Sequence, residues 1–340
     1  MDIQSMSIEE KVGQLFIAGF NGKRINGEAI NLITTYHIGG IHFFNRNDKN
    51  PRQIHKLATN LQRYINKNIP LFLVAQQKGG EQNSLIEKVT ISPSQKQLGN
   101  INNRLYTKQI AEIVGEELRA IGINMNFSPT FDINEESETS FGGEIDLVSK
   151  HGIAALQGFA QANLIPAVKL DHYIKEIFTH DLWNRTALQP NIDKLQQLLD
   201  TIVISNQFIT DFKQSSPTPC SPTVITEFLR ESVSSTGIII ADHSEIQSKE
   251  AVIVSFQAGV DIVLLNDTYE NQIKTIDTVI QAVQSGKISE EQIDRSVERI
   301  VKLKTERNIG LIEPYNEENF MQKRSLALSE KLTHLAANHS

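Results

Sequence analysis

Short apolar runs alternate with longer amphipathic segments along almost the whole chain. Eight of the short runs are rich in Ile, Val, Leu or Phe, which is typical of parallel strands buried on both faces. We therefore predict eight strands. They are Leu15–Phe20, Gly40–Phe44, Leu71–Ala75, Asn124–Phe127, Ile165–Lys169, Gln207–Asp211, Gly237–Ala241 and Asp261–Leu265.

The segments between these runs carry hydrophobic residues at helical spacing. The first begins with Ser7-Ile8-Glu9-Glu10, the pattern of a capping box. Another begins at Pro51 and repeats apolar residues from Ile54 to Ile65. Further helices are predicted over Tyr106–Ile121, Ile145–Ala162, Ile192–Ile202, Ser221–Val233, Lys249–Ala258 and Glu270–Gln284.

Strict alternation of strands and helices favours a parallel sheet with helical crossovers. Eight strands indicate a closed TIM-type (β/α)8 barrel. The alternative is an open doubly wound sheet, but no glycine-rich dinucleotide motif follows the first predicted strand. We predict one barrel domain over residues 1–312, with Ser289–Arg307 as its last helix. A helical tail over residues 313–340, including Glu317–Ala337, is expected to pack on the barrel and leaves no room for a further domain.

The composition is that of an ordinary globular protein, with 39% hydrophobic and 21% charged residues among 340. These values exclude a disordered chain, a collagen and a disulfide scaffold. Asp and Glu number 40 against 33 Lys and Arg, so the net charge is −7, which disfavours a nucleic-acid partner. The single Cys220 lies between Pro219 and Ser221, and we interpret it as a loop residue rather than a nucleophile.

Membrane and metal signals are weak in this chain. The longest apolar runs are too short to cross a bilayer, and the first residues lack the basic and apolar regions of a signal peptide. The nine His residues form no HExxH or similar ligand spacing. We expect a cytoplasmic protein with no membrane span, no metal and no cofactor.

In a closed barrel, functional residues follow the carboxyl ends of the strands. Polar side chains cluster there after four of the predicted strands. They are Gln76–Gly80 after the third, Asp132 with Asn134 and Ser140–Gly143 after the fourth, Lys169–His172 after the fifth and Asp242–Glu245 after the seventh.

Three stretches resemble a known enzyme family. Tyr36–Ile41 is similar to its His-Val-Gly-Gly-Val strand, and Leu118–Pro129 followed by Asp132-Ile133-Asn134 is a longer match. Ser221–Thr226 leading to Gly237–Asp242 is a third. The chain resembles the family 3 glycoside hydrolases, and among them the single-domain bacterial β-N-acetylhexosaminidases that trim cell-wall muropeptides. This resemblance covers nearly the whole chain and implies the same barrel fold as the periodicity.

The resemblance also implies a reaction. Family members are retaining enzymes, in which a carboxylate attacks the anomeric carbon and an acid protonates the leaving oxygen. Asp242 matches the nucleophile and Lys169 matches a substrate-binding lysine. The alternative for Asp242 is a loop carboxylate that caps the following helix, but the surrounding match favours the nucleophile position. For Asp132, a structural role in its own loop is at least as plausible as a ligand contact.

The chain departs from the family at most of the other site positions. Leu170 stands where the family binds substrate with a His, and Ile174 and Glu176 replace its acid His–Asp pair. The family sequence Asp-Gln-Glu-Gly-Gly is Gln76–Gly80 here, so Gln76 keeps an amide without the carboxylate and Lys78 reverses a charge. Thr139 replaces an Arg, the side chain suited to bidentate recognition.

Two functional hypotheses follow. The first is a family 3 barrel that has lost efficient hydrolysis and binds an amino-sugar or glucoside ligand, or a protein partner. The second is an active retaining glycosidase of β-N-acetylhexosaminidase type with altered specificity and Asp242 as nucleophile. In either case Lys169, Gln76, Asp132 and His172 are the predicted binding residues. His172 or the pair His180-Asp181 is the candidate replacement for the missing acid.

Overall fold

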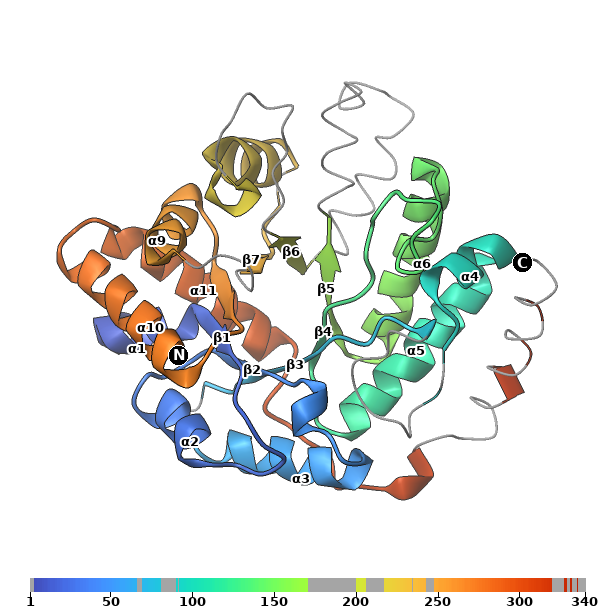
Figure 1. The fold of residues 1–340 in the computed structure, drawn as a ribbon, viewed down its shortest axis with the longest axis horizontal. Helices are drawn as coiled ribbons and strands as arrows, with labels where there is room; N and C mark the ends of the chain where they lie inside the picture. The colour runs from blue at the N-terminus through green and yellow to red at the C-terminus, as the bar shows by residue number, and fades with distance from the viewer. Residues whose placement is uncertain are drawn as a thin grey trace. The chain divides into compact units, whose positions relative to one another are not determined.

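A computed structural model describes residues 3–65, 69–80, 90, 92–170, 200–205, 217–233, 235–242 and 248–319, with 327, 328, 331 and 335. Eight parallel strands follow one another in chain order around a closed barrel. Figure 1 shows the strands and the helices that alternate with them. The predicted (β/α)8 architecture is therefore confirmed, and the open doubly wound alternative is wrong.

The strands are short and buried. They are β1 Phe16–Ala18, β2 Gly40–His42, β3 Phe72–Ala75, β4 Met125–Asn126, β5 Ile165–Lys169, β6 Thr201–Ser205, β7 Ile238–Asp242 and β8 Ile262–Leu265. Within these described strands, every residue is buried except Lys169 and Asp242. Each of the two is the last residue of its strand, so these strands reach solvent only at their carboxyl ends.

The helices follow the amphipathic segments. They are α1 Ile8–Gln14, α2 Gly27–Thr34, α3 Pro51–Gln62, α4 Gln95–Ile101, α5 Arg104–Ala120, α6 Ile145–Gln161, α9 Lys249–Ala258, α10 Tyr269–Gln284 and α11 Glu290–Glu306. Thr223–Ser232 forms a π-helix, and 3₁₀ turns occur at Ile3–Ser5, Asn45–Asn47, Thr218–Cys220 and Glu317–Asn319. The predicted capping box is present, since Ser7 Oγ accepts from Glu10 N and Glu10 Oε2 accepts from Ser7 N.

The sixth strand was predicted wrongly. The structure has β6 at Thr201–Ser205, where the last two residues of the predicted helix Ile192–Ile202 lie. The predicted strand Gln207–Asp211 lies outside the described residues, as do residues 192–199. Apolar residues occur in both segments at spacings that fit a helix and a strand, so the pattern does not separate the two there.

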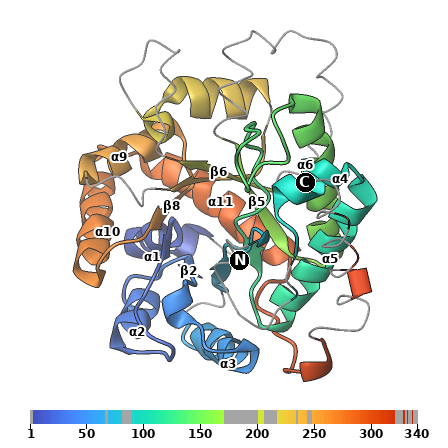
Figure 2. The same cartoon turned by 45° about the vertical axis from the view of Figure 1, so that its right-hand side comes forward.

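The chain divides into two compact units. The first comprises Met1–Asn47, Lys56–Val74 and Asp200–Leu311. Within it, β1 pairs with β2 and β8, β2 pairs with β3, and β7 pairs with β6 and β8. Helices α10 and α11 both pack on α1, and α9 packs on α10, as Figure 2 shows.

The second unit comprises Asp48–His55, Ala75–Leu199 and Ile312–Ser340. Its centre is the long packing of α5 along α6, visible in Figure 2. Both helices bury one apolar face, with Ile110 and Val114 from α5 and Ala155 and Phe159 from α6. The strand pair β4 and β5 lies in this unit. The predicted boundary between barrel and tail after residue 312 stays a prediction.

A buried carboxylate ties four elements of the first unit together. Asp261, directly before β8, is fully buried and accepts hydrogen bonds from Ile239 N at 2.8 Å and Ser296 Oγ at 2.8 Å. It also accepts from Arg299 Nη1 at 2.7 Å and from Arg230 of the π-helix. Two guanidiniums and two neutral donors thus offset the cost of burying this charge.

A lysine with no carboxylate partner among the described residues lies in the interior of the same unit. Lys304 of α11 is 2% exposed, and its ammonium donates to Gln14 Oε1 and to Gly39 O, each at 2.8 Å. It also lies 4.7 Å from the centre of the Phe72 ring. Burial lowers the pKa of Lys304 well below its usual value, because the charged form loses its hydration.

Replacing Asp261→Asn should destabilise the protein strongly. An amide leaves two guanidiniums without a counter-charge, and breaking a buried pair in this way typically costs about 3–5 kcal/mol. Urea unfolding followed by circular dichroism measures the free energy of unfolding. The matched control is Glu250→Gln, whose exposed pair with Lys287 should contribute less than about 1 kcal/mol. Equal losses in the two variants would contradict this account.

The pH dependence of the unfolding free energy should reveal the lowered pKa of Lys304. Its pKa is lower in the folded than in the unfolded state, so stability is lost as pH falls from about 10.4 toward the folded pKa. Relative to Lys304→Met, the wild-type free energy of unfolding should rise by up to about 1.4 kcal/mol per pH unit on approaching pH 10. The exposed Lys302→Met on the same helix is the control. A wild-type pH profile that matches the Lys304→Met profile would refute the prediction.

Candidate functional site

Asp242 ends the seventh strand, as the sequence predicted. Its backbone stays in register with the sheet, opposite Ser205 on β6 and Leu264 on β8. The side chain is half-buried, in contrast with the buried residues Ile238–Ala241 before it. The carboxylate therefore lies at the carboxyl end of the strand, where (β/α)8 proteins place their chemistry.

A histidine that the sequence reasoning missed interacts with Asp242. His42 ends β2, is 4% exposed and has its pKa lowered to about 4. Burial is the main cause of this shift, with a smaller contribution from the Arg46 guanidinium, and the Asp242 carboxylate opposes both. The imidazole is therefore neutral near pH 7. A lone His in the otherwise apolar run Gly40–Phe44 was the available signal.

Aromatic stacking holds the groups around His42. The rings of His42 and Phe44 have centroids 4.2 Å apart, and the Arg46 guanidinium lies 4.1 Å from the Phe44 centroid. Arg46 Nε also donates to Phe20 O at 3.1 Å. A Cβ at Gly19 would come within 2.8 Å of the Phe44 ring and 2.9 Å of Arg46. The loop after β1 must therefore carry a glycine for this stack to form.

The loop after β3 contains Gln76, one of the predicted binding residues. Gln76 and Lys78 are half-buried, and Gln77 between them is 2% exposed. Asn126 of β4 fixes this loop, because its Oδ1 accepts from Gln77 N at 2.8 Å and its Nδ2 donates to Gln77 O at 3.0 Å. Gly79 follows with a φ of 84°, and a Cβ there would lie 2.4 Å from Pro93 O.

Lys169 and the loop of Asp132 come together in the second unit. Lys169 ends β5 and forms a bridge with Thr130, and its carbonyl accepts from Phe131 N at 2.8 Å. Both Lys169 and Asp132 are half-buried. Ser140 organises the Asp132 loop, since its hydroxyl donates to the carbonyls of Asp132 and Gly142.

The structure also describes Thr139 and Leu170, two positions where the chain departs from the family. Thr139 keeps its hydroxyl 3.0 Å from Ser137 Oγ, and its carbonyl accepts from Thr130 Oγ1. Leu170 is 5% exposed. His172, His180, Asp181, Ile174 and Glu176 lie outside the described residues.

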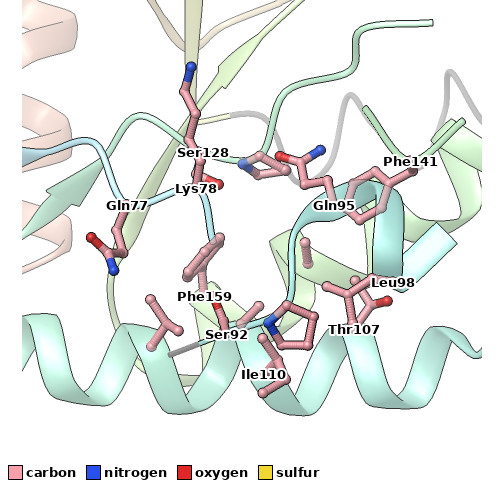
Figure 3. Close-up of a pocket in the computed structure, with 15 residues that line it drawn as sticks. Gln77, Lys78, Ser92, Gln95, Leu98, Thr107, Ile110, Ser128, Phe141 and Phe159 are labelled. Atoms are coloured by element: carbon pink, nitrogen blue, oxygen red, sulfur yellow. The ribbon is translucent and has the colours of Figure 1, made fainter. Parts of the chain in front are cut away.

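A cavity lies in the second unit beside the Gln77 loop. Its empty volume is about 370 Å³, counting its open mouth, and helices α5 and α6 contribute its apolar wall. Figure 3 shows the side chains around it, with Gln77 at one edge. Among the residues that the structure describes, neither polar atom of the Gln77 amide has a hydrogen-bond partner. Burying such a group unpaired typically costs about 1–3 kcal/mol, so Gln77 calls for an explanation.

Other chemistry is sparse in the part of the chain that the structure describes. No three His, Cys, Asp or Glu residues are grouped there so as to hold a metal ion. None of its helices is long and apolar enough to cross a bilayer. The Cys220 thiol is buried and lies 3.4 Å from both Ala251 O and Ser255 Oγ, and burial raises its pKa. A thiol with a raised pKa is a poor nucleophile, consistent with a structural role.

Two relatives named as hexosaminidases share part of this sequence. Beta-hexosaminidase A of Pseudoalteromonas piscicida is 26% identical over 334 residues, which cover 82% of this chain and 55% of that protein. The chain thus spans about half the length of that relative. Beta-hexosaminidase of Haemophilus influenzae is 24% identical over 293 residues, with coverage of 76% and 81%.

A solved structure gives a closer structural comparison. The glycoside hydrolase family 3 β-N-acetylglucosaminidase from Paenibacillus sp. str. FPU-7 superposes with a TM-score of 0.86 at 30% identity, covering 98% of this chain and 69% of that one. The sequence model of the glycosyl hydrolase family 3 N-terminal domain matches residues 7–303. The match spans every strand of the barrel, and so the chain belongs to glycoside hydrolase family 3.

Proposed function

We propose that this chain is a family 3 barrel that binds an amino-sugar or glucoside ligand at the carboxyl ends of its strands and has lost efficient hydrolysis. The observation that carries the proposal is the pair Thr139 and Leu170. The resemblance calls for an Arg and a His at these positions. A threonine held in its own loop and a buried leucine offer no charged donor to a sugar.

The remaining polar groups support binding. Gln76, Lys169 and Asp132 are half-buried at the ends of β3, β5 and β4, where amide, ammonium and carboxylate groups can form hydrogen bonds with sugar hydroxyls. Half-burial strengthens such bonds, because part of the competing water is excluded. The relatives named as hexosaminidases make an N-acetylamino sugar the first ligand to test.

The replaced residues are expected to lower the rate of hydrolysis far more than they weaken sugar binding. Removal of one preorganised donor typically lowers the rate by about 10²–10³, and loss of a general acid by about 10²–10⁴. Such effects do not multiply strictly, since the groups act together. Two replaced recognition groups and a replaced acid are nevertheless enough to reduce hydrolysis below a useful rate while a sugar still binds.

A second candidate function is retaining hydrolysis with Asp242 as nucleophile. The observation that favours it is the interaction of Asp242 with the buried, neutral His42. In this reaction the Asp242 carboxylate would bond to the anomeric carbon as the bond to the leaving oxygen breaks. An acid would give that oxygen a proton, and water would then release the sugar. His172 or the pair His180-Asp181 would have to supply the proton.

An aryl-glycoside assay distinguishes the two functions. Against aryl N-acetylglucosaminide and aryl glucoside, we expect kcat/KM at least about 10⁴-fold below that of the Paenibacillus enzyme assayed in parallel. The residual rate should be unchanged in Asp242→Asn. Clear turnover that disappears in Asp242→Asn would overturn the proposal and establish the second function.

Binding is tested separately by calorimetry with N-acetylglucosamine. Lys169→Ala should weaken the affinity by about 10-fold or more, the typical contribution of a hydrogen bond from a charged group. Lys150→Ala is the matched control, because Lys150 is exposed on α6 and donates to Asn102 at 2.7 Å. If the wild type binds neither N-acetylglucosamine nor glucose at millimolar concentration, the saccharide proposal is wrong.

A further inference from the structure

Arg46, in the loop after β2, carries a guanidinium that its neighbours hold in place. The guanidinium lies 4.1 Å from the centre of the Phe44 ring, and Nε donates to Phe20 O at 3.1 Å. The Phe44 ring also contacts the His42 ring, with centroids 4.2 Å apart. A free arginine side chain samples many rotamers, so these contacts give up part of that freedom in advance and leave the guanidinium pre-organised for a ligand.

The loops after β1 and β2 are joined to each other by Asn47, a fully buried residue of the first unit. Its Nδ2 donates to Phe20 O at 3.1 Å and to Gly22 O at 2.8 Å. Its Oδ1 accepts from Phe44 N at 3.0 Å. Because the same two loops provide the partners of the Arg46 guanidinium, these hydrogen bonds fix the surface on which that guanidinium lies.

Arg46 has no counter-charge within the part of the chain that the structure describes. No carboxylate of these residues forms an ion pair with it. By contrast, Arg230 and Arg299 in the same unit share the Asp261 carboxylate. Burial lowers the pKa of Arg46, because the charged form loses part of its hydration. A partly desolvated cation of this kind would gain more from an external anion than a fully hydrated one.

The two loops are basic, although the chain as a whole is acidic. Residues 19–27 and 43–47 contain Lys23, Arg24 and Arg46 but no Asp or Glu, whereas the net charge of the chain is −7. All three cationic residues are exposed. A local excess of positive charge attracts anions and raises their concentration at that surface.

The guanidinium also selects the kind of anion. Phe20 O already occupies Nε of Arg46, so the four N–H groups on its two Nη atoms are the donors that face a ligand. Two parallel N–H groups of a planar guanidinium match two oxygens of a carboxylate or of a phosphate. Asp242 and Arg46 both act on the charge of His42, in opposite directions, so the guanidinium lies at the same end of the barrel as Asp242.

We propose that Arg46 binds a small oxyanion, a carboxylate or a phosphate, through its Nη atoms at the carboxyl end of the first unit. The anion is either free in solution or a substituent of a sugar. The site goes beyond the saccharide binding proposed above and does not depend on it, since Gln76, Lys169 and Asp132 belong to the second unit. Failure of either proposal leaves the other standing.

Inorganic phosphate and acetate are the first probes, and the full-length ¹⁵N-labelled protein reports on them by nuclear magnetic resonance. The Nε–Hε signal of Arg46, assigned from its absence in Arg46→Gln, should shift on titration with either anion. The signal of Arg295 should shift much less, because Arg295 already pairs with Glu291 at 2.7 Å. Sodium chloride at the same ionic strength controls for screening of surface charge.

Variants separate the guanidinium from the overall charge of the surface. The backbone amide signals of residues 43–47 give the affinity for phosphate, and its apparent Kd should rise about 10-fold in Arg46→Gln. Arg46→Lys keeps the charge but loses the planar pair of donors, so it should restore only part of the affinity. Arg295→Gln removes the same charge from α11 of the same unit and should leave the Kd unchanged.

Sugars that carry an anion identify its source and need no variant. Glucose 6-phosphate and glucuronate should bind more tightly than phosphate and acetate if the anion is a sugar substituent, and equally if the free anion is the ligand. Glucose should leave the Arg46 signal in place in both cases. The absence of a shift at tens of millimolar phosphate and acetate would overturn the proposal. An equal shift with sodium chloride, or equal losses of affinity in Arg46→Gln and Arg295→Gln, would overturn it as well.

Discussion

A parallel strand satisfies its backbone only when a neighbour lies on each side, and closing the sheet provides this for all eight strands at once. Helices then cover the outer surface, so the strand residues become buried on both faces. Strand side chains can reach solvent only where the strands end. Lys169 and Asp242, the half-buried last residues of β5 and β7, follow directly from this constraint.

The same constraint explains how much of the fold could be predicted. Burial on both faces requires consecutive apolar residues, and seven of the eight predicted runs overlap an observed strand. The sixth does not, because the apolar residues before and after Thr201–Ser205 fit a helix and a strand equally well. The helices α2 and α4, of 8 and 7 residues, were not predicted, since so short a segment shows little periodicity.

The candidate site was predictable in part. The order of strands places Gln76, Asp132, Lys169 and Asp242 at strand ends without any structure. The environment of His42 could not be predicted, because it depends on Arg46 in the next loop and on Asp242, 200 residues away along the chain. The motif around Gln77 was interpretable as a recognition loop, but only packing reveals that Gln77 itself is buried.

The two ends of the seventh strand have different roles. Ile239, near its start, is held by the Asp261 carboxylate and its two arginines, whereas Asp242 ends it three residues later. At about 3.3 Å per residue, these positions are roughly 10 Å apart. Substitution at the functional end of the barrel therefore leaves the anchor intact. In evolutionary terms, a lineage can alter or abandon the inherited chemistry while selection on folding continues to preserve the scaffold.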